Sequence, residues 1–390
     1  NVYLVGGSTT TYGDMRFDSC SFIDATYAGI STGQSYICLT LKYCNFSNYS
    51  TSTTYYGMKL GNVTSRTNID TCINNRFKCT ATGSNYGIYL GQPVNYNGQL
   101  AGVHAYVANN EIIIRGGSNS NHGLYWYNMG YVKYYANSVH IEGTGGTSYG
   151  FFMMNTSVTY THFLRYNNFY INNPNGTAYS IWHTSGSFAP GLLTADYNNY
   201  YVSGPYVASN FTSLQAWQSS SSQDLNSLNE KTNFIDYPNT LTTDGKRAIM
   251  PVNDEVPVDI LDSVRTSYTN MGCYDDFVPS TFDAKMAEIV APTHGIPVGV
   301  STPVSVIIEK AGAILDSVEI HWSVNGTVQP IYYWKQAGGL AFGQKSTLIT
   351  LGNFTPISGA NTVVVWTDKP NNYPDGNVYN DTLSVVVVSC

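Results

Sequence analysis

Short apolar stretches alternate with polar positions through the first two hundred residues, and none of these stretches has the spacing of a helix. The alternation over a few positions at a time is typical of short β-strands. The stretches fall into a repeat with two anchors. The first is an Asn-X-apolar step such as Asn110-Glu111-Ile112, and the second is an aromatic-Gly-apolar step such as Tyr149-Gly150-Phe151. A drifting period of roughly thirty residues, carried by both anchors, predicts a β-solenoid with insertions in its coils.

The first anchors are expected to stack in one inward column at a bend of the coil. Asn side chains one strand spacing apart can bond to one another and to the backbone of the bend, so such a column satisfies its own amides. Cys20 and Cys44 occupy the same slot in the first coils. They are interpreted either as stacked buried thiols or as a disulfide, because their α-carbons would lie about 4.8 Å apart. The members of the predicted column are Cys20, Cys44, Asn75, Asn110, Asn137, Asn168 and Asn199.

The pattern changes at about residue 205. A short capped helix is predicted around Trp217, and three phrases follow it: Asp224-Leu225-Asn226-Ser227, Asp262-Ser263-Val264-Arg265 and Gly272-Cys273-Tyr274. This closing segment, 205–280, resembles the end of secreted bacterial right-handed parallel β-helix proteins of the pectate-lyase-like superfamily. Cys273 and Asp275 stand where family members often have Ala and Glu. The resemblance implies that residues 1–280 form a right-handed parallel β-helix whose last coils are finished by these phrases.

Alternating strands return near the end of the chain without the period of the coils. Residues 281–300 contain Pro292, Pro297 and two glycines and are interpreted as a linker. Residues 301–390 then predict a β-sandwich. The phrase Trp322-Ser323-Val324-Asn325-Gly326 and the later Asn380-Asp381-Thr382 make this region similar to Ig-like modules in secreted and surface proteins of Bacteroidetes. Such modules commonly act as spacers before a sorting domain of the type IX secretion route. The expected fold class is all-β.

Composition narrows the possible partners. Charged residues are 11% of the chain, the formal net charge is −7, and Lys and Arg form no cluster, so nucleic acid is a poor partner. No apolar stretch is long enough for a membrane span. The chain opens inside a coil, at Asn1-Val2-Tyr3-Leu4, without a signal segment. We therefore expect a processed or truncated piece of a longer protein, and the resemblance implies an extracellular or cell-surface location.

Enzymes of the β-helix class need convergent charges. A lyase of the pectate kind needs carboxylates for calcium and a basic residue to accept the substrate proton, and a hydrolase needs paired carboxylates. The carboxylates of the coils do not fall in one column. Asp14, Arg16 and Asp18, which alternate on one predicted strand, are the best candidate cluster, and the alternative interpretation is a solvated ion group. No metal-ligand spacing is present and no cofactor is expected, except calcium if the protein is a lyase.

The second anchors point to a different kind of site. Two residues after each aromatic-Gly pair, alternation places an outward side chain, because the intervening apolar residue points inward. The resulting row of rings is Tyr89, Tyr125, Phe152 and Trp182. Exposed aromatic rows usually bind a partner, and flat rings suit the faces of sugars. Alternatively, a loop, a neighbouring subunit or the C-terminal module covers the row, or the row stabilises the stack.

These observations favour a non-catalytic, adhesin-like surface or secreted protein that binds polysaccharide or cell-surface glycan, or assembles with other subunits. A polysaccharide lyase or glycoside hydrolase is the main alternative, and a trimeric phage tailspike fits the helix but not the terminal module. Three Asp-Ser/Thr-apolar triplets also resemble an O-glycosylation signal of exported Bacteroidetes proteins. Their hydroxyl residues are Ser263, Ser317 and Thr382.

Overall fold

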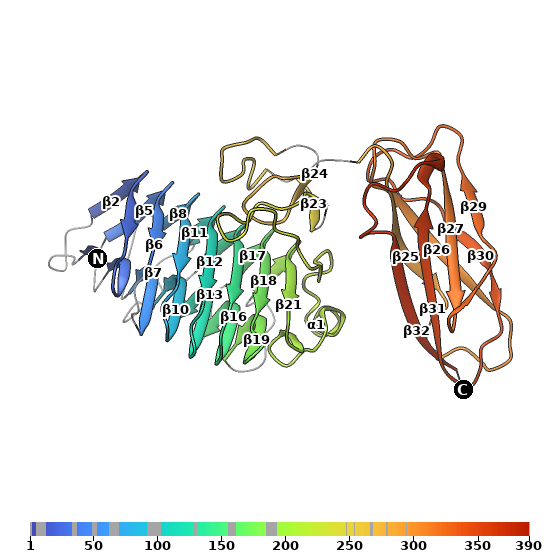
Figure 1. Cartoon of the computed structure of the whole chain (residues 1–390), viewed down its shortest axis with the longest axis horizontal. Helices are drawn as coiled ribbons and strands as arrows, with labels where there is room; N and C mark the ends of the chain where they lie inside the picture. Colours follow the sequence, from blue (N-terminus) through green and yellow to red (C-terminus); the bar gives the residue numbers. More distant parts are fainter. Residues whose placement is uncertain are drawn as a thin grey trace. The chain divides into compact units, whose positions relative to one another are not determined.

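The computed structural model divides the chain into two compact units, Asn1–Phe277 and Val278–Cys390, which are described separately (Figure 1). The fold is all-β. The residues that the structure describes are 2–4, 13–32, 37–48, 53–61, 70–91, 103–127, 131–154, 161–184, 193–246, 248–252, 254–265, 268–277, 280–293 and 295–389.

The first unit is a parallel β-solenoid built from three sheets that the chain visits in turn (Figure 1). Sheet 1 has eight strands: β1 (Val2–Leu4), β4 (Ala28–Thr32), β7 (Thr54–Leu60), β10 (Ser84–Leu90), β13 (Ser120–Tyr127), β16 (Thr147–Met154), β19 (Thr177–His183) and β22 (Tyr206–Ala208). Sheet 2 has seven: β2 (Gly13–Asp18), β5 (Ile37–Lys42), β8 (Asp70–Ile73), β11 (Val103–Ala108), β14 (Tyr131–Tyr135), β17 (His162–Arg165) and β20 (Leu193–Asp196). Sheet 3 also has seven: β3 (Ser21–Ile23), β6 (Asn45–Ser47), β9 (Arg76–Cys79), β12 (Glu111–Arg115), β15 (Ser138–Glu142), β18 (Asn168–Asn172) and β21 (Asn199–Val202).

An Asn column runs along the bend between sheets 2 and 3. The side-chain amide of Asn75 donates to Oδ1 of Asn110 at 3.0 Å, and Asn110 donates in the same way to Asn137 at 2.9 Å. The column continues through Asn167 and Asn198, again at 2.9 Å per step. Each Oδ1 also accepts the backbone N–H of the preceding member, as in Asn110 N to Asn137 Oδ1 at 3.1 Å. The buried amides therefore satisfy one another and hold the coils in register.

The prediction was wrong for the last two members of the column. Asn168 and Asn199 lie one residue further along, in sheet 3, where the Asn199 amide donates to Asn168 Oδ1 at 3.0 Å. Both bends carry two consecutive asparagines, so the sequence pattern fits either register. The core selects the observed one, because it places Phe169 in line with Val139 on the inward face.

At each bend, the residue with left-handed backbone is the one immediately before the column residue, not the column residue itself. The residues with positive φ at these bends are Ser19, Tyr43, Asn74, Asn109, Ala136, Tyr166 and Tyr197, each one position before a column member. This backbone region is costly for most side chains. At the five bends from Asn74 to Tyr197, the next residue is an asparagine of the stacked column, whereas a cysteine follows Ser19 and Tyr43.

Glycine at the second anchor makes room for the apolar residue of the first. A β-carbon on Gly123 would lie 2.3 Å from Val139 Cγ1, and one on Gly150 would lie 2.7 Å from Phe169 Cδ1. The paired anchors thus touch across the core, between sheets 1 and 3. This contact explains why the two anchors recur together in the repeat.

The closing segment adds β22 to the edge of sheet 1 and then leaves the strand pattern of the coils. It continues with α1 (Leu214–Ser221), whose N-cap Ser213 accepts the backbone N–H of Ala216 at 3.1 Å. Buried Asp224 then ends the Asn column by accepting from Asn198 Nδ2 at 3.1 Å and from Trp217 Nε1 at 2.8 Å. Beyond it, residues 229–277, with β23 (Ile249–Pro251) and β24 (Tyr268–Asn270), return along sheets 2 and 3.

Buried Arg265 fixes this returning segment to the coils. Its guanidinium donates to Thr269 Oγ1 at 2.7 Å, to Gly272 O at 2.8 Å and to Asn109 Oδ1 at 3.1 Å. Asp262 accepts from Tyr43 Oη at 2.9 Å and from Asn74 Nδ2 at 3.2 Å. The Asp-x-x-Arg phrase is therefore a clamp between distant parts of the chain.

The second unit contains antiparallel sheets. One has three strands, β25 (Ala284–Ala291), β26 (Thr302–Lys310) and β30 (Ile349–Phe354). The other has β28 (Thr327–Val328), β27 (Ser317–Val324), β31 (Gly359–Asp368) and β32 (Thr382–Ser389), with β29 (Tyr332–Lys335) paired to β27 and a 3₁₀ turn η1 (Pro370–Asn372) before β32. The sheets share an apolar core around Trp322. Because β25 lies within 281–300, the prediction that this whole range is a linker was wrong; its prolines follow the strand.

Candidate functional site

Sheet 1 carries two parallel rows of aromatic side chains on its outer face. The first row comes from the residue before each anchor glycine or its Ser180 replacement, and comprises Tyr56, Tyr86, His122, Tyr149 and Tyr179, continued by Tyr206. The second row is the sequence-predicted one, and the strand register aligns Tyr89, Tyr125, Phe152 and Trp182 with Lys59 at its start. The sequence analysis did not identify the first row as a surface feature, although its residues are the aromatic members of the aromatic-Gly-apolar anchor.

The rings stack along the rows and interlock between them. Tyr89 and Tyr125 have ring centroids 4.6 Å apart and an interplanar angle of 12°, and Tyr125 and Phe152 lie 4.8 Å apart at 10°. Between the rows the contacts are edge-to-face, as for His122 and Phe152 at 4.9 Å and 88°. Each ring thus covers the faces of its neighbours.

This packing changes what the surface offers to a partner. Tyr89, Tyr125 and Trp182 are half-buried, and Phe152 is only 9% exposed. The ring faces that the sequence suggested for sugar stacking are largely covered by neighbouring rings of the row. Mainly the ring edges are left for contact with a partner. Trp182 departs from the parallel stack, with its ring tilted by 55° against Tyr179 at 4.6 Å.

The aromatic surface is uncharged over a wide pH range. Burial lowers the pKa of His122 to about 3, so its imidazole is neutral between the rings of Tyr86 and Tyr149. Burial also raises the pKa of Tyr89 to about 12, and it raises the pKa of Tyr125 as well. The exception is Lys59, whose ammonium lies 4.6 Å from the ring centroid of Tyr56 and places a cation at one end of the rows.

The other two sheets are covered by the returning segment. Met250 and Val256 pack with Tyr106 and Phe163 of sheet 2, and Leu241 and Ile260 pack with Ile113 of sheet 3. Polar contacts follow the same path, as in Lys133 Nζ to Glu255 Oε1 at 3.1 Å. The described residues of 229–277 contact the coils at sheets 2 and 3, which distinguishes sheet 1 as the face with an aromatic surface of its own.

The predicted cluster of Asp14, Arg16 and Asp18 lies on β2 at one end of the solenoid. Arg16 Nη2 and Asp18 Oδ2 form an ion pair at 2.7 Å, with side-chain exposures of 65% and 39%. This hydrogen bond lowers the pKa of Asp18. Asp18 is also in register with Lys42 of β5.

The buried carboxylates of the first unit have structural partners. Asp70 accepts the backbone N–H of Leu39 at 2.7 Å. Glu111 accepts from Tyr274 Oη at 3.0 Å and lies 3.3 Å from Arg76 Nε, and Asp224 accepts from Tyr200 Oη at 3.0 Å. Among the described residues, the groups of three that could hold a metal ion lie in the second unit.

The described cysteines are free thiols, so Cys20 and Cys44 are not joined by a disulfide. Cys44 is buried, and its Sγ lies 3.2 Å from the carbonyl oxygen of Lys42. Burial raises the pKa of the Cys44, Cys72 and Cys273 thiols, which disfavours the reactive thiolate. The side chain of His104 and residue Cys390 lie outside the described residues.

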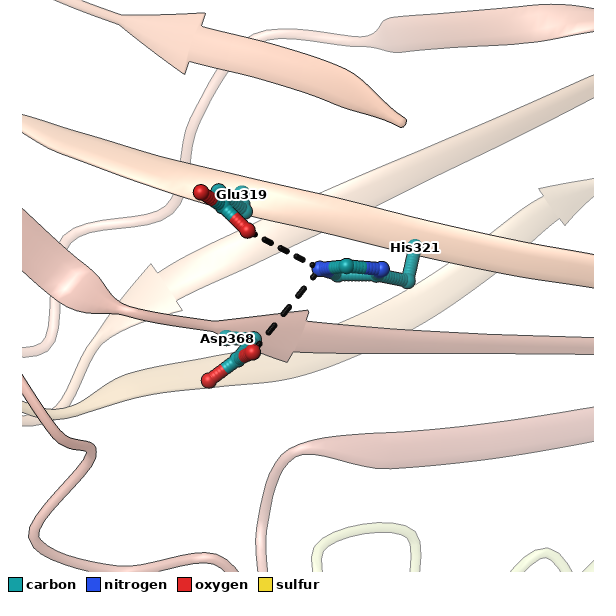
Figure 2. Close-up of side chains that lie close together, drawn as sticks. All are labelled: Glu319, His321 and Asp368. Carbon is teal, nitrogen blue, oxygen red and sulfur yellow. Dashed lines mark hydrogen bonds and ion pairs between the residues drawn. The ribbon is translucent and has the colours of Figure 1, made fainter. Parts of the chain in front are cut away.

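A mixed cluster lies on the second unit, where Glu319 and Asp368 approach the same nitrogen of His321 (Figure 2). His321 Nε2 is 3.2 Å from Glu319 Oε2 and 3.9 Å from Asp368 Oδ2. Lys369 Nζ is 3.0 Å from the same Glu319 oxygen, and this hydrogen bond lowers the pKa of Glu319. The ammonium already supplies the cation that these carboxylates need, so an ion-pair network accounts for the cluster.

The three O-glycosylation candidates differ in accessibility. Ser263 and Thr382 are exposed, whereas Ser317 is half-buried in β27. We predict that native material carries added sugar at Ser263 and Thr382 in preference to Ser317, because a modifying enzyme must reach the hydroxyl. Intact-mass measurement followed by site mapping checks this expectation. An unmodified mass from the native source would contradict it.

No protein-family model matches the chain, and no curated protein matches it. A solved structure that does match is the crystal structure of the CARDB domain of a protein from Pyrococcus furiosus, in complex with di-metal ions. It is 21% identical, covers 30% of this chain and 98% of that domain, and has a TM-score of 0.24, a likeness too weak to assign a family. Within the described residues, no helix has the length and apolar character needed to cross a membrane.

Proposed function

We propose that this chain is part of a non-catalytic, secreted or cell-surface protein in which the outer face of sheet 1 binds a glycan. In this proposal the solenoid is a right-handed parallel β-helix of the pectate-lyase-like type, and the second unit is an Ig-like spacer of the kind found in Bacteroidetes surface proteins. The observation that carries the proposal is the double aromatic surface on sheet 1, beside two sheets that the chain covers with its own residues.

The geometry of the rows favours one mode of binding. Because ring faces are stacked inside the rows, a glycan would lie across the ring edges and tyrosine hydroxyls, with Trp182 as the tilted ring available for stacking. The rings are held by two neighbours each, so little side-chain entropy is lost on binding. A neutral surface with one lysine suits a neutral or weakly acidic polysaccharide better than a strongly charged one.

Removing two rings tests this proposal. Replacing both Tyr125 and Trp182 by Ala is expected to abolish retention on a polysaccharide that the unmodified chain binds, since each ring supplies on the order of 1 kcal/mol. Each single change should weaken binding severalfold. Affinity electrophoresis in gels that contain each polysaccharide of a neutral and acidic panel measures the loss.

Tyr201→Ala is the matched control, because it removes a ring that packs against Tyr170 in sheet 3, not in sheet 1. It should leave retention unchanged. Equal loss in the control and the double variant would contradict the proposal, and circular dichroism of each variant shows whether the fold persists. If light scattering instead finds an oligomer that the double variant breaks, sheet 1 is an assembly surface and the glycan proposal fails.

A further inference from the structure

Three aspartates from separate parts of the second unit converge on one point. Asp283 immediately precedes β25, Asp375 follows η1, and Asp381 immediately precedes β32. One carboxylate oxygen of each lies within 4.8 Å of the others. Asp283 is 4% exposed and Asp381 is 7% exposed, so two of the three carboxylates are almost removed from water.

Hydrogen bonds satisfy this cluster only in part. Asp375 accepts the backbone N–H groups of Ala284 and Asn377, at 3.1 and 2.8 Å. Asp283 Oδ1 accepts from Asn380 Nδ2 at 3.1 Å. Oδ1 of Asp381 has no hydrogen-bond partner, although it is buried. A buried carboxylate oxygen without a donor is costly, and such an atom in a native protein usually has an ion or water that completes its surroundings.

Among the described residues, no ion pair joins this cluster to a basic side chain, whereas Lys369 pairs with Glu319 in the cluster around His321. The ion pairs found among the described residues join other carboxylates, including Glu319 to Lys369 at 3.0 Å. The charge of Lys285 lowers the pKa of Asp283, but this effect is smaller than that of burial. Three carboxylates whose oxygens lie within 4.8 Å of one another repel strongly when all are ionised in a poorly solvated site.

The available ligands are all oxygens. Besides the three carboxylates, Oδ1 of Asn380 is buried without a hydrogen-bond partner, and the amide of this residue already touches Asp283. The chain around them reads Asp375-Gly376-Asn377-Val378-Tyr379-Asn380-Asp381, which is rich in oxygen-bearing side chains. Calcium takes six to eight oxygen ligands in a flexible geometry, whereas zinc and other softer metals favour His and Cys, and neither is part of this cluster.

We propose that Asp283, Asp375 and Asp381 hold a calcium ion, with the side-chain oxygen of Asn380 as a further ligand. The ion would tie the start of β25, in the three-stranded sheet, to the loop that leads into β32 of the other sheet. Backbone contacts already bring these segments together, as in Met286 N to Asn380 O at 3.1 Å and Gly376 N to Phe282 O at 2.9 Å.

Burial raises the pKa of Asp283 to about 7, and the charge of Asp375 contributes to this shift. Burial also raises the pKa of Asp381 to about 8, with contributions from the charges of Asp375 and Asp283. A divalent cation would reverse this effect and keep all three carboxylates ionised.

Calcium titration of the full chain after treatment with a chelator tests the proposal. Isothermal calorimetry should find one calcium ion bound, and calorimetric scanning should find a transition that rises by about 5–10 °C in millimolar calcium. Magnesium at the same concentration should raise it less, because it demands a tighter octahedral site. Asp381→Asn keeps the side-chain shape and removes one charge.

This variant separates a cation site from a merely structural cluster. In chelator it should melt at the same temperature as the unmodified chain or higher, because it relieves repulsion, yet calcium should no longer shift the transition. Glu319→Gln, which removes a carboxylate from the cluster around His321, should keep the full calcium response. The proposal is overturned if the unmodified chain binds no calcium, if Asp381→Asn retains the binding, or if Glu319→Gln abolishes it.

Discussion

Asn137→Ala is expected to lower the free energy of unfolding of the solenoid by about 2–4 kcal/mol. The substitution removes the acceptor of two donors, the backbone N–H of Asn110 at 3.1 Å and its side-chain amide at 2.9 Å. It also leaves the carbonyl of Val107 without the donor that now lies at 3.0 Å. All of these groups are buried, so water does not replace the lost partner.

Denaturant unfolding monitored by circular dichroism measures this loss. Asn119→Ala is the control, because Asn119 belongs to the same solenoid but is exposed, and it should change the stability by less than about 0.5 kcal/mol. Because each coil contacts its neighbours, hydrogen exchange should show reduced protection in the coils on both sides of residue 137. Equal stability of the two variants would refute the role given to the column.

Arg265→Met is expected to release the returning segment at a cost of about 2–4 kcal/mol. The guanidinium bonds to acceptors of its own segment and to Asn109 of the coils. Burial lowers its pKa, and the nearby charges of Asp275 and Asp259 partly oppose that effect. Methionine fills much of the volume but leaves those acceptors unpaired. Arg265→Lys should recover only part of the loss, because an ammonium cannot reproduce the planar fork.

Hydrogen exchange followed by mass spectrometry distinguishes local release from global unfolding. Protection should fall in residues 229–277 and in the outer positions of sheets 2 and 3, while the Asn column keeps its protection. Arg16→Met is the control, because Arg16 is 65% exposed and pairs with Asp18 at 2.7 Å on the surface, where an ion pair contributes little. A change confined to sheet 1 would contradict the clamp.

The sequence predicts the solenoid well because its signal is local and repeated. Each coil carries the same two phrases, and their contact across the core follows from the size of Gly and of the apolar residue. The prediction fails at Asn167-Asn168, where two consecutive residues are both asparagine. There only the packing of the core decides which asparagine enters the column. The path of residues 229–277 is equally hidden, because Arg265 and Asn109 are distant in sequence.

The candidate sites show the same division. Alternation predicts the aromatic row from Tyr89 to Trp182, since outward positions follow from the strand period. The stacking that covers the ring faces depends on the second row, whose residues sequence reasoning treated as anchors. The aspartate cluster left no signal in spacing, because Asp283 reaches Asp375 and Asp381 only after the sheets have packed.

If this protein binds a glycan without degrading it, as we propose, binding and the absence of products should be seen together. Incubation of the full chain with a panel of neutral and acidic polysaccharides, in calcium, measures retention and product formation on the same samples. We predict retention on at least one polysaccharide, with no new reducing ends and no unsaturated products over time. The appearance of either product, lost on changing Asp14 or Asp18, would contradict this account and identify a hydrolase or a lyase.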